Sequence, residues 1–398
     1  MEHEMDTHDL DSLKEGLVPF FQPIVEVSTG MITAFETLAR YHKPNGEISS
    51  AAFLFHDDYL PKNIQRELDQ HVRMQAIRNI RSLPDNTRLT VNISPELIEF
   101  QDGMPIIRTM MMLKSENISP QKVVIELVES DGVISDLAVL VHRYREQGLR
   151  IAVDDFGSGF SHFDRVIELT PDIIKLDMRL LKKALSGGRF ARVAVKSIVD
   201  FCEKSGALVV MEGVETEEEF FFGLSCGAHY MQGYLFSPAV AEFLPKDTFK
   251  DQIETLRTTY FNETRKTLRD STRWNKHLVQ TINRIKERSH VAGFIRNDIE
   301  PELKSIPHLI RYYMTDYEGN QLSPNFSLNS SGQFVDEGTP WENVNWSWRP
   351  YFCKASNARR AIVSDVYYDL HSGKSCKTIV VRLGNGEMLL VDVLVSED

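Results

Sequence analysis

The sequence has few cysteines and no long apolar run. Four cysteines occur among 398 residues, widely spaced and without a CxxC or Cys/His cluster. This pattern is no disulfide framework and gives no indication of zinc. No apolar run approaches the ~18 residues that a membrane-spanning helix needs. The acidic start MEHEMDTHDLDSLKEG is unlike a signal peptide. We therefore expect a cytoplasmic protein without a membrane span.

The sequence also lacks an excess of basic residues. Lys and Arg number 45 against 57 Asp and Glu, which gives a formal net charge of −12. Broad binding to DNA or to anionic membrane needs the opposite balance and is not expected. A small anionic substrate is compatible with this charge, because bound divalent cations can reverse the local field.

Short apolar runs alternate with amphipathic, helix-like stretches between residues 17 and 240. Strand and helix in repetition predict parallel strands joined by crossover helices. Roughly eight such runs fit an α/β fold of the TIM-type (β/α)8 barrel better than an open sheet. The runs are PFFQPIVEV, MITAFETLA, RLTVNIS, KVVIELVE, LRIAVDD, DIIKLD, ALVVMEG and GAHYMQGYLF.

Polar or charged residues stand at the trailing end of nearly every one of these runs. In a barrel, these strand ends all point to one face, which is where such barrels place their chemistry. Residues far apart in the sequence are therefore expected to meet in one pocket. They are Glu36, Asn92, Glu126, Asp154, Asp155, Lys175, Glu212 and Gln232.

Two further segments follow the predicted barrel, which we place at residues 1–245. Residues 246–290 carry apolar side chains at steps of three and four and lack Gly and Pro, which predicts a long amphipathic helical linker. The polar stretch from Asn262 to Ser271 is compatible with a break or a solvated turn. Residues 291–398 contain strand-like runs and the hairpin signal Asn385-Gly386, which predicts a small α+β domain with an antiparallel sheet.

Asp154 and Asp155 begin the segment DDFGSG directly after the run LRIAV. Adjacent carboxylates at a strand end repel each other unless something compensates, and a pair of divalent metal ions would do so. Oxygen-rich ligand sets suit Mg²⁺ or Mn²⁺, and two such ions can clamp a phosphodiester and activate water. An ordinary solvated turn also explains this segment, since Asp and Gly are common turn residues.

The other polar strand ends strengthen the metal hypothesis. Each one alone is also explained by a side chain that bonds to nearby backbone. Together with the Asp pair, however, they make a carboxylate and amide set sized for two octahedral ions. The predicted metal ligands are Glu36, Asn92, Glu126, Asp154, Asp155 and Glu212.

Three further residues are candidates for chemistry or substrate binding. Lys175 could orient or help deprotonate an attacking water, although charge balance or a salt bridge to Asp177 would also explain it. Arg40 could hold a phosphate with two hydrogen bonds, although a surface arginine is an equal alternative. Gln232, before Gly233-Tyr234, could bond a base, a ribose or a metal-bound water.

These motifs, taken together, resemble the EAL-domain family of cyclic di-GMP phosphodiesterases. The similarity runs from about Phe20 to Pro238, with FETLAR in place of the usual EAL signature. The motifs occur in the order typical of the family, which makes the resemblance highly specific. They are FQPIV, FETLAR, TVNIS, ELVES, DDFGSGFS, PDIIKLD, MEGVET and GAHYMQGYLFSPA.

The resemblance implies a TIM-type barrel with two Mg²⁺ or Mn²⁺ ions that hydrolyses cyclic di-GMP to linear pGpG. It implies that the six predicted ligands hold the metals and that Lys175 orients the water, with Glu36, Asp154 and Asp155 also in the catalytic set. It further implies that Glu129 braces the loop that carries the Asp pair. Gln22, Arg40 and Gln232 would contact the substrate or support the ligands. Glu215 is an alternative to Glu212, which lies nearer the end of its strand.

Two departures from the family pattern stand out. Thr37 replaces the usual alanine beside Glu36, but neighbouring strand residues point to opposite faces, so we expect little harm. Residues 51–71 lack the Pro-x-x-Phe-Ile…Ala-Glu pattern, which affects the expected substrate wall and dimer surface rather than the metals. A homodimer is expected, because barrels of this family often dimerise and the linker helix offers an apolar stripe.

Residues 291–398 resemble a PAS/Cache-like sensory domain through YMTDYEGNQLSPNF, WSWRPYF and SDVYYDLHSGKSCKTIVV. Arg349, Tyr351, Tyr367 and Asp392 occupy ligand-pocket positions in broadly similar folds. An equal alternative is that they brace the small sheet. We therefore hypothesise a small-molecule ligand for this region and regulation of the barrel through the helix.

Two rival hypotheses compete with an active phosphodiesterase. The first is a barrel that binds cyclic di-GMP without cleaving it and signals through the C-terminal domain. The second is a protein-interaction scaffold built on the long helix. Barrels that bind cyclic di-GMP without cleaving it normally lose a metal ligand or the lysine, whereas all of these residues are present here. The complete polar set therefore favours the enzyme.

Overall fold

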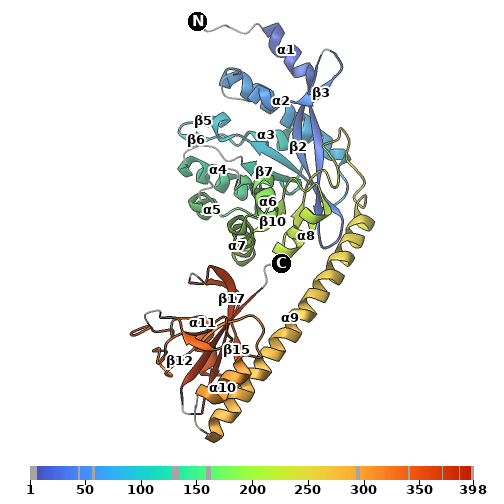
Figure 1. The fold of residues 1–398 in the computed structure, drawn as a ribbon. Helices are drawn as coiled ribbons and strands as arrows, with labels where there is room; N and C mark the ends of the chain where they lie inside the picture. Colours follow the sequence, from blue (N-terminus) through green and yellow to red (C-terminus); the bar gives the residue numbers. More distant parts are fainter. Residues whose placement is uncertain are drawn as a thin grey trace. The chain divides into compact units, whose positions relative to one another are not determined.

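The structure is a computed structural model in two compact units, Met1–Tyr260 and Phe261–Asp398, and each unit is described by itself (Figure 1). Among the described residues, none of the helices is both long enough and apolar enough to cross a membrane. The described residues are 7–43, 45–55, 59–127, 134–157, 163–292, 296–338, 341–369, 371–384 and 386–395.

A closed barrel forms the first unit, as the sequence predicts. In the described part of the chain, the strand order is β1-β11-β10-β9-β8-β7-β4-β2, and a pairing of β1 with β2 closes the ring. The strand β3 (Ile48–Ser50) extends β2 outside the ring. The barrel strands are β1 (Leu17–Glu26), β2 (Ile32–His42), β4 (Arg88–Ile93), β7 (Val123–Leu127), β8 (Arg150–Phe156), β9 (Ile173–Leu176), β10 (Leu208–Met211) and β11 (Tyr230–Met231).

One strand of the barrel departs from the all-parallel arrangement of a (β/α)8 barrel. β1 is antiparallel to both of its neighbours, β2 and β11, whereas the other pairings around the ring are parallel. The reason is the short connection: residues 27–31 suffice for a hairpin but cannot form a crossover helix. The barrel is therefore mixed, and Gln22 of β1 pairs directly with Glu36 of β2.

The helices of this unit cover the barrel with their apolar faces. In α7, for example, Val195, Ile198, Val199 and Cys202 are buried at helical spacing. α8 begins with a capping box between Thr216 and Glu219. The helices are α1 (Thr7–Gly16), α2 (Lys62–Asn79), α3 (Arg108–Ser115), α4 (Ile134–Glu146), α5 (Phe163–Leu169), α6 (Met178–Leu185), α7 (Arg189–Ser205) and α8 (Glu217–Cys226), with a small hairpin of β5 (Phe100–Gln101) and β6 (Met104–Pro105).

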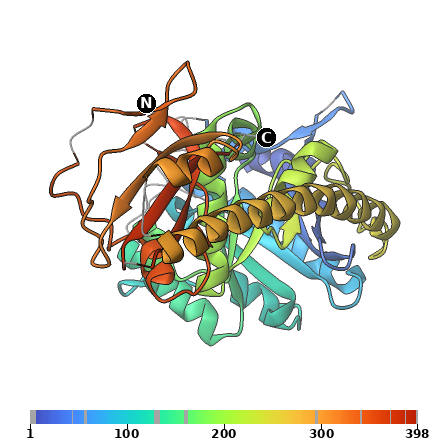
Figure 2. The ribbon, with the colours of Figure 1, turned by 60° about the horizontal axis from the view of Figure 1, so that its bottom comes forward.

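The helix α9 (Lys250–Ala292) is continuous over 43 residues, as both views show (Figure 1 and Figure 2). The alternative of a break or a solvated turn between Asn262 and Ser271 is therefore wrong. The stretch is exposed but contains no Gly or Pro, and Thr267 donates a hydrogen bond to the Glu263 carbonyl one turn earlier. Near one end, Ile253 and Leu256 belong to the barrel core, and near the other Ile282 and Ile285 belong to the core of the second unit.

The second unit is an α+β domain with a seven-stranded sheet among the described residues. Its pairings are antiparallel, as predicted, in the order β14-β13-β12-β18-β17-β15 with β16 on β17. Asn385 lies outside the described residues. The elements are α10 (Arg296–Leu303), β12 (Leu309–Thr315), β13 (Phe326–Leu328), β14 (Phe334–Asp336), α11 (Pro350–Ser356), β15 (Ile362–Val363), β16 (Tyr367–Asp369), β17 (Lys374–Arg382) and β18 (Met388–Leu394).

Strand alternation gives this sheet two different faces. On one face, Tyr312 and Val391 join a core that includes Ile282 of α9. On the other face, Tyr313 and Leu390 pack with Phe352 of α11.

Candidate functional site

Lys175 lies at the centre of the polar strand ends of the barrel. Its side chain is 1% exposed, and its Nζ lies 2.8 Å from both Asp154 Oδ1 and Glu212 Oε1. Glu36 Oε2 follows at 3.2 Å and Glu126 Oε2 at 3.3 Å. These carboxylates come from β2, β7, β8 and the residue after β10. The barrel thus brings together five of the residues that the sequence places at strand ends.

The carboxylates form two overlapping groups that could each hold a metal ion. Carboxylate oxygens of Glu36, Glu126 and Asp154 lie within 4.8 Å of one another, and so do those of Asp154, Asp155 and Glu212. Asp154 belongs to both groups. Two groups that share one carboxylate have the donor chemistry of a two-ion site for Mg²⁺ or Mn²⁺.

The electrostatics of the site show an excess of negative charge. Burial raises the pKa of Glu126 and of Glu212 well above the ordinary value, since their acidic neighbours add to it and Lys175 only partly opposes it. Burial, then Asp154 and Asp177, raise the pKa of Asp155 to about 6. Burial disfavours the charged Lys175, but the surrounding carboxylates prevail and raise its pKa. The pocket therefore favours additional cations.

The backbone at Asp155 is unusual. Its φ of 54° lies in the left-handed region, and the register between β8 and β9 shifts between Val153 and Phe156. In a regular strand, consecutive side chains point to opposite faces. The bulge allows Asp154 and Asp155 to direct carboxylate oxygens to the same place. Strained non-glycine backbone of this kind is concentrated at functional sites.

Amide side chains complete the wall around Glu36. Gln232 Nε2 donates to Glu36 Oε2 at 2.5 Å and to Gln22 Oε1 at 3.0 Å. Asn92 Nδ2 lies 3.4 Å from Glu36 Oε1. The Oδ1 atom of Asn92 is buried and has no hydrogen-bond partner in the described structure. An orphaned buried oxygen on a residue next to Glu36, and paired across the strands with Glu126, is suited to a cation.

A cleft of about 320 Å³ opens above this site. Gln22, Glu36, Asp155, Glu212 and Gln232 line it. Arg40 lines a neighbouring hollow of about 410 Å³ together with Asn92, and Leu38 lines both. Thr37 faces this hollow, whereas Glu36 faces the cleft, in keeping with strand alternation.

Some site residues differ from expectation or lie outside the described structure. Glu129 lies outside the described residues. Asp177 accepts a hydrogen bond from the backbone N–H of Arg179 at 2.7 Å and forms an ion pair with the Arg179 side chain at 3.0 Å. It therefore pairs with Arg179 and not with Lys175. Glu215 lies 3.2 Å from Lys182 on the wall of the cleft and belongs to neither of the two carboxylate groups.

Asp177 and Tyr234 also line the cleft, although neither was predicted from the sequence to lie there. Each stands two residues after a predicted site residue, Lys175 or Gln232. This spacing along the strand ends is the sequence feature that could have identified them.

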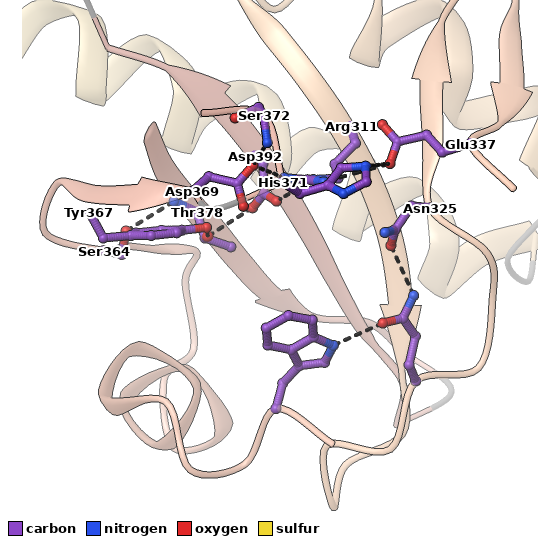
Figure 3. Close-up of polar contacts among 12 residues, drawn as sticks. Arg311, Asn325, Glu337, Ser364, Tyr367, Asp369, His371, Ser372, Thr378 and Asp392 are labelled. Carbon is purple, nitrogen blue, oxygen red and sulfur yellow. Dashed lines mark hydrogen bonds and ion pairs between the residues drawn. The ribbon is translucent and has the colours of Figure 1, made fainter. Parts of the chain in front are cut away.

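A second buried polar cluster lies on the sheet of the C-terminal unit (Figure 3). Arg311 is 5% exposed, and its Nε donates to Asp392 Oδ2 at 2.9 Å. Its Nη2 donates to Asp369, and its Nη1 lies 3.6 Å from Glu337. Thr378 donates to the other Asp392 oxygen at 2.8 Å and also bonds the Tyr367 hydroxyl at 2.8 Å.

The four C-terminal residues singled out from the sequence meet at this cluster. The rings of Tyr351 and Tyr367 stack with centroids 6.3 Å apart. The Arg349 guanidinium lies 5.4 Å from the Tyr367 ring centroid. Tyr367 connects through Thr378 to Asp392. Arg311 was not predicted, because an arginine within a strand is not distinguishable from a surface residue without its partners.

Comparisons with known proteins agree with this architecture. Residues 9–239 match the EAL domain, and residues 243–396 match the EAL-domain associated signalling protein domain. The EAL-domain containing protein YkuI of Bacillus subtilis is 26% identical over 401 residues, which cover 98% of this chain and 97% of YkuI. The crystal structure of YkuI in complex with substrate c-di-GMP and calcium has the same fold, with a TM-score of 0.85, 24% identity and 99% and 100% of the two chains covered.

Two other relatives match over about half of this chain. The cyclic di-GMP phosphodiesterase PA2567 of Pseudomonas aeruginosa is 30% identical over 228 residues, 56% of this chain and 38% of PA2567. Klebsiella pneumoniae BlrP1, in a manganese and cy-diGMP complex, has a TM-score of 0.50 at 28% identity over 56% of each chain. Since the match to the EAL domain covers more than half of the chain, from residue 9 to residue 239, this protein belongs to the EAL domain family.

Proposed function

We propose that this protein is a phosphodiesterase that hydrolyses cyclic di-GMP to linear pGpG with two Mg²⁺ or Mn²⁺ ions. The observation that carries the proposal is the pair of carboxylate groups that share Asp154 around the buried Lys175. Family membership supports it, as does PA2567, which is named a cyclic di-GMP phosphodiesterase. The c-di-GMP bound to YkuI and the manganese in BlrP1 point to the same substrate and metal class.

The donor set fits two divalent ions. Glu36, Glu126, Asp154, Asp155 and Glu212 carry five negative charges when ionised, and Lys175 offsets one of them. Two divalent cations would balance the remaining four. One ion would be held by Glu36, Asn92, Glu126 and Asp154, and the other by Asp154, Asp155 and Glu212. Such ions stabilise charge on a phosphodiester and make bound water more acidic.

Lys175 has two roles in this proposal. Its ammonium holds Asp154 and Glu212 at 2.8 Å, which fixes the shared carboxylate in place. Its three N–H donors face four carboxylates here, so one of them could orient an attacking water once bound ions take over part of that pairing. Burial excludes bulk solvent from the ammonium, so its interactions with the carboxylates are weakly screened.

The remaining predicted residues surround the place where the substrate would lie. Gln22 and Gln232 line the cleft beside Glu36, and Gln232 also orients that carboxylate. Arg40, in the neighbouring hollow, could bind a phosphate oxygen. For Glu129 we retain the family role of bracing the loop that carries the Asp pair.

The experiment that tests the proposal follows cyclic di-GMP and pGpG by chromatography with purified full-length protein. We expect cleavage with Mg²⁺ or Mn²⁺, loss of cleavage with EDTA, and at least a ~100-fold lower rate in Asp154→Asn, because an electrostatic contribution of that size is typical of one catalytic group. Asp200→Asn, which removes an exposed carboxylate on α7, is the matched control. Tight binding without product would instead support the non-catalytic receptor, and neither binding nor cleavage would support the scaffold.

We also propose that the C-terminal domain binds a small molecule and regulates the barrel, and that the protein is a homodimer. α9 supports the regulatory role, because one uninterrupted helix contributes side chains to the cores of both units. Light scattering of the purified protein would test the dimer.

A further inference from the structure

A small cavity lies inside the barrel at the end opposite to the carboxylates. Its volume is about 40 Å³, and every strand of the ring contributes to its lining. The first residues of several parallel strands lie on it, namely Arg88 of β4, Arg150 of β8, Ile173 of β9, Leu208 of β10 and Tyr230 of β11. Because parallel strands begin at the same end of a barrel, this cavity marks its amino-terminal mouth.

Strand alternation places Arg88 and Arg150 on the inner face of the barrel. In β4, Arg88, Thr90 and Asn92 are spaced by two residues, and Asn92 reaches the carboxylate end. In β8, Arg150 precedes Asp154 by an even number of residues. Residues at even spacing lie on the same face of a strand. The alternation that carries acidic groups inward at one end therefore carries basic groups inward at the other.

The polar groups at this mouth lack partners. In the part of the chain that the structure describes, the side chains of Arg88, Arg150 and Tyr230 form no hydrogen bond or ion pair. Burial lowers the pKa of Arg88, and the charge of Arg150 lowers it further, so the two guanidinium groups repel each other. Glu26 acts on the pKa of Tyr230, but its Oε2 already accepts from Thr29 at 2.6 Å. Two unpaired cations and a phenol thus converge on one cavity.

Packing alone does not account for this arrangement. The amino-terminal face of a barrel usually serves stability. Arg88 is half-buried, however, so it loses part of its hydration and gains no ion pair in return. Lys175 provides the contrast, because it is buried in the same barrel but contacts four carboxylates. The group that would compensate the amino-terminal mouth in the same way is an anion.

A further polar side chain lies deeper in the cavity. Thr90 is 2% exposed, and its hydroxyl has no hydrogen-bond partner of ordinary geometry, although it lies near enough to Glu126 to lower the pKa of that carboxyl. Both residues line the cavity. A polar occupant would give the Thr90 hydroxyl a partner. The negative charge of Glu126 would confine an anion to the outer part of the cavity, beside the arginines.

We propose that the amino-terminal mouth of the barrel binds a tetrahedral oxyanion, either free phosphate or the phosphoryl group of a phosphate monoester. Arg88 and Arg150 would pair with oxygen atoms of the anion, and the Tyr230 hydroxyl would donate a further hydrogen bond. A cavity of about 40 Å³ has room for roughly three water-sized groups, which suits a phosphoryl group but not a base or a sugar. The inference does not rest on hydrolysis of cyclic di-GMP.

The test measures binding to the full-length protein by titration calorimetry in EDTA, so that no divalent ion attracts anions to the carboxylates. The probes are inorganic phosphate, sulfate and glycerol 3-phosphate, each in chloride buffer of constant ionic strength. We expect phosphate and sulfate to bind with a Kd of about 1 mM or tighter. Glycerol 3-phosphate that binds as tightly as phosphate would identify a monoester as the ligand, and weaker binding would identify the free ion. If none of the three binds at that level, the proposal is overturned.

Variants then locate the site. Arg88→Gln and Arg150→Gln are each expected to weaken phosphate binding by at least ~10-fold, because one charge-assisted pair is lost. Arg145→Gln is the matched control, since Arg145 already donates to the Thr170 hydroxyl at 3.2 Å and should not contribute. Arg40→Gln tests the hollow beside the metal groups and should leave phosphate binding unchanged. Binding that is lost in Arg40→Gln but kept in Arg88→Gln and Arg150→Gln would contradict the assignment.

Two further measurements keep the outcomes distinct. Circular dichroism checks the fold of each variant, and Arg150, which is exposed, keeps the proposal falsifiable if Arg88→Gln fails to fold. Cleavage of cyclic di-GMP by the native protein is measured separately with Mg²⁺ or Mn²⁺. Phosphate binding without cleavage would refute only the phosphodiesterase, and cleavage without phosphate binding would refute only this inference.

Discussion

At the scale of single residues, Lys175 connects the stability of the barrel to its proposed chemistry. A cation with 1% exposure is costly to bury unless it is paired, and here it contacts four carboxylates. Removing it leaves those carboxylates close together without their shared cation. The same residue that would orient water therefore also holds the carboxylates together when no metal ion is bound.

We expect Lys175→Met to lower the free energy of unfolding by about 3–5 kcal/mol in EDTA, the cost typical of breaking a buried ion pair. The loss should be smaller with Mn²⁺, because bound ions would take over part of the charge compensation. Thermal unfolding with and without metal measures both effects. Lys182→Met removes the exposed pair with Glu215 and should cost about 0–1 kcal/mol. An equal loss with and without Mn²⁺ would count against metal binding at this site.

The sequence predicted most of this site because its chemistry repeats at strand ends. Glu36, Glu126, Asp154, Lys175 and Glu212 are each conspicuous as a polar residue in or after an apolar run, and the barrel gathers them. The left-handed backbone of Asp155 was not predictable, because it depends on the register shift between β8 and β9. Nor was the excess of carboxylates around Arg311, since its partners come from distant strands.

At the scale of elements, two features needed the structure. The sequence pattern predicted a (β/α)8 barrel, in which all strands are parallel. β1 is antiparallel to its neighbours instead, because the turn that follows it is too short for a crossover helix. The continuity of α9 through a polar stretch shows that exposure alone does not end a helix. Residues such as Arg269 and Glu263 favour helix in water, and no Gly or Pro interrupts them.

The C-terminal half of α9 is expected to be essential to the second unit. Ile282 is 0% exposed in a core with Val391 and Ile379. Ile282→Ala should therefore cost about 2–5 kcal/mol, the range for large-to-small changes in a core. Leu268→Ala, at a position on the same helix that is 60% exposed, should change stability by about 0.5 kcal/mol or less. Chemical denaturation followed by circular dichroism distinguishes the two, and similar losses would contradict the packing of α9.

At the scale of the whole molecule, α9 is the element through which a signal could pass. It contributes Phe249, Ile253 and Leu256 to the barrel core and Leu278, Ile282 and Ile285 to the core of the second unit. Between residues 261 and 270 it is exposed except at Thr264, which is half-buried, so its helical structure there depends mainly on backbone hydrogen bonds. A break in that stretch would leave both cores their own side chains while interrupting the helix.

We therefore expect Thr267→Pro to uncouple the two units. Proline removes the backbone donor at an exposed position and destabilises the helix locally by about 3 kcal/mol. The variant should still cleave cyclic di-GMP and still bind the C-terminal ligand, but the ligand should no longer change the cleavage rate. Thr267→Ala, which loses only the hydroxyl bond to Glu263, should respond like the native protein. If the ligand changes the cleavage rate of Thr267→Pro as much as that of the native protein, regulation does not pass through a continuous α9.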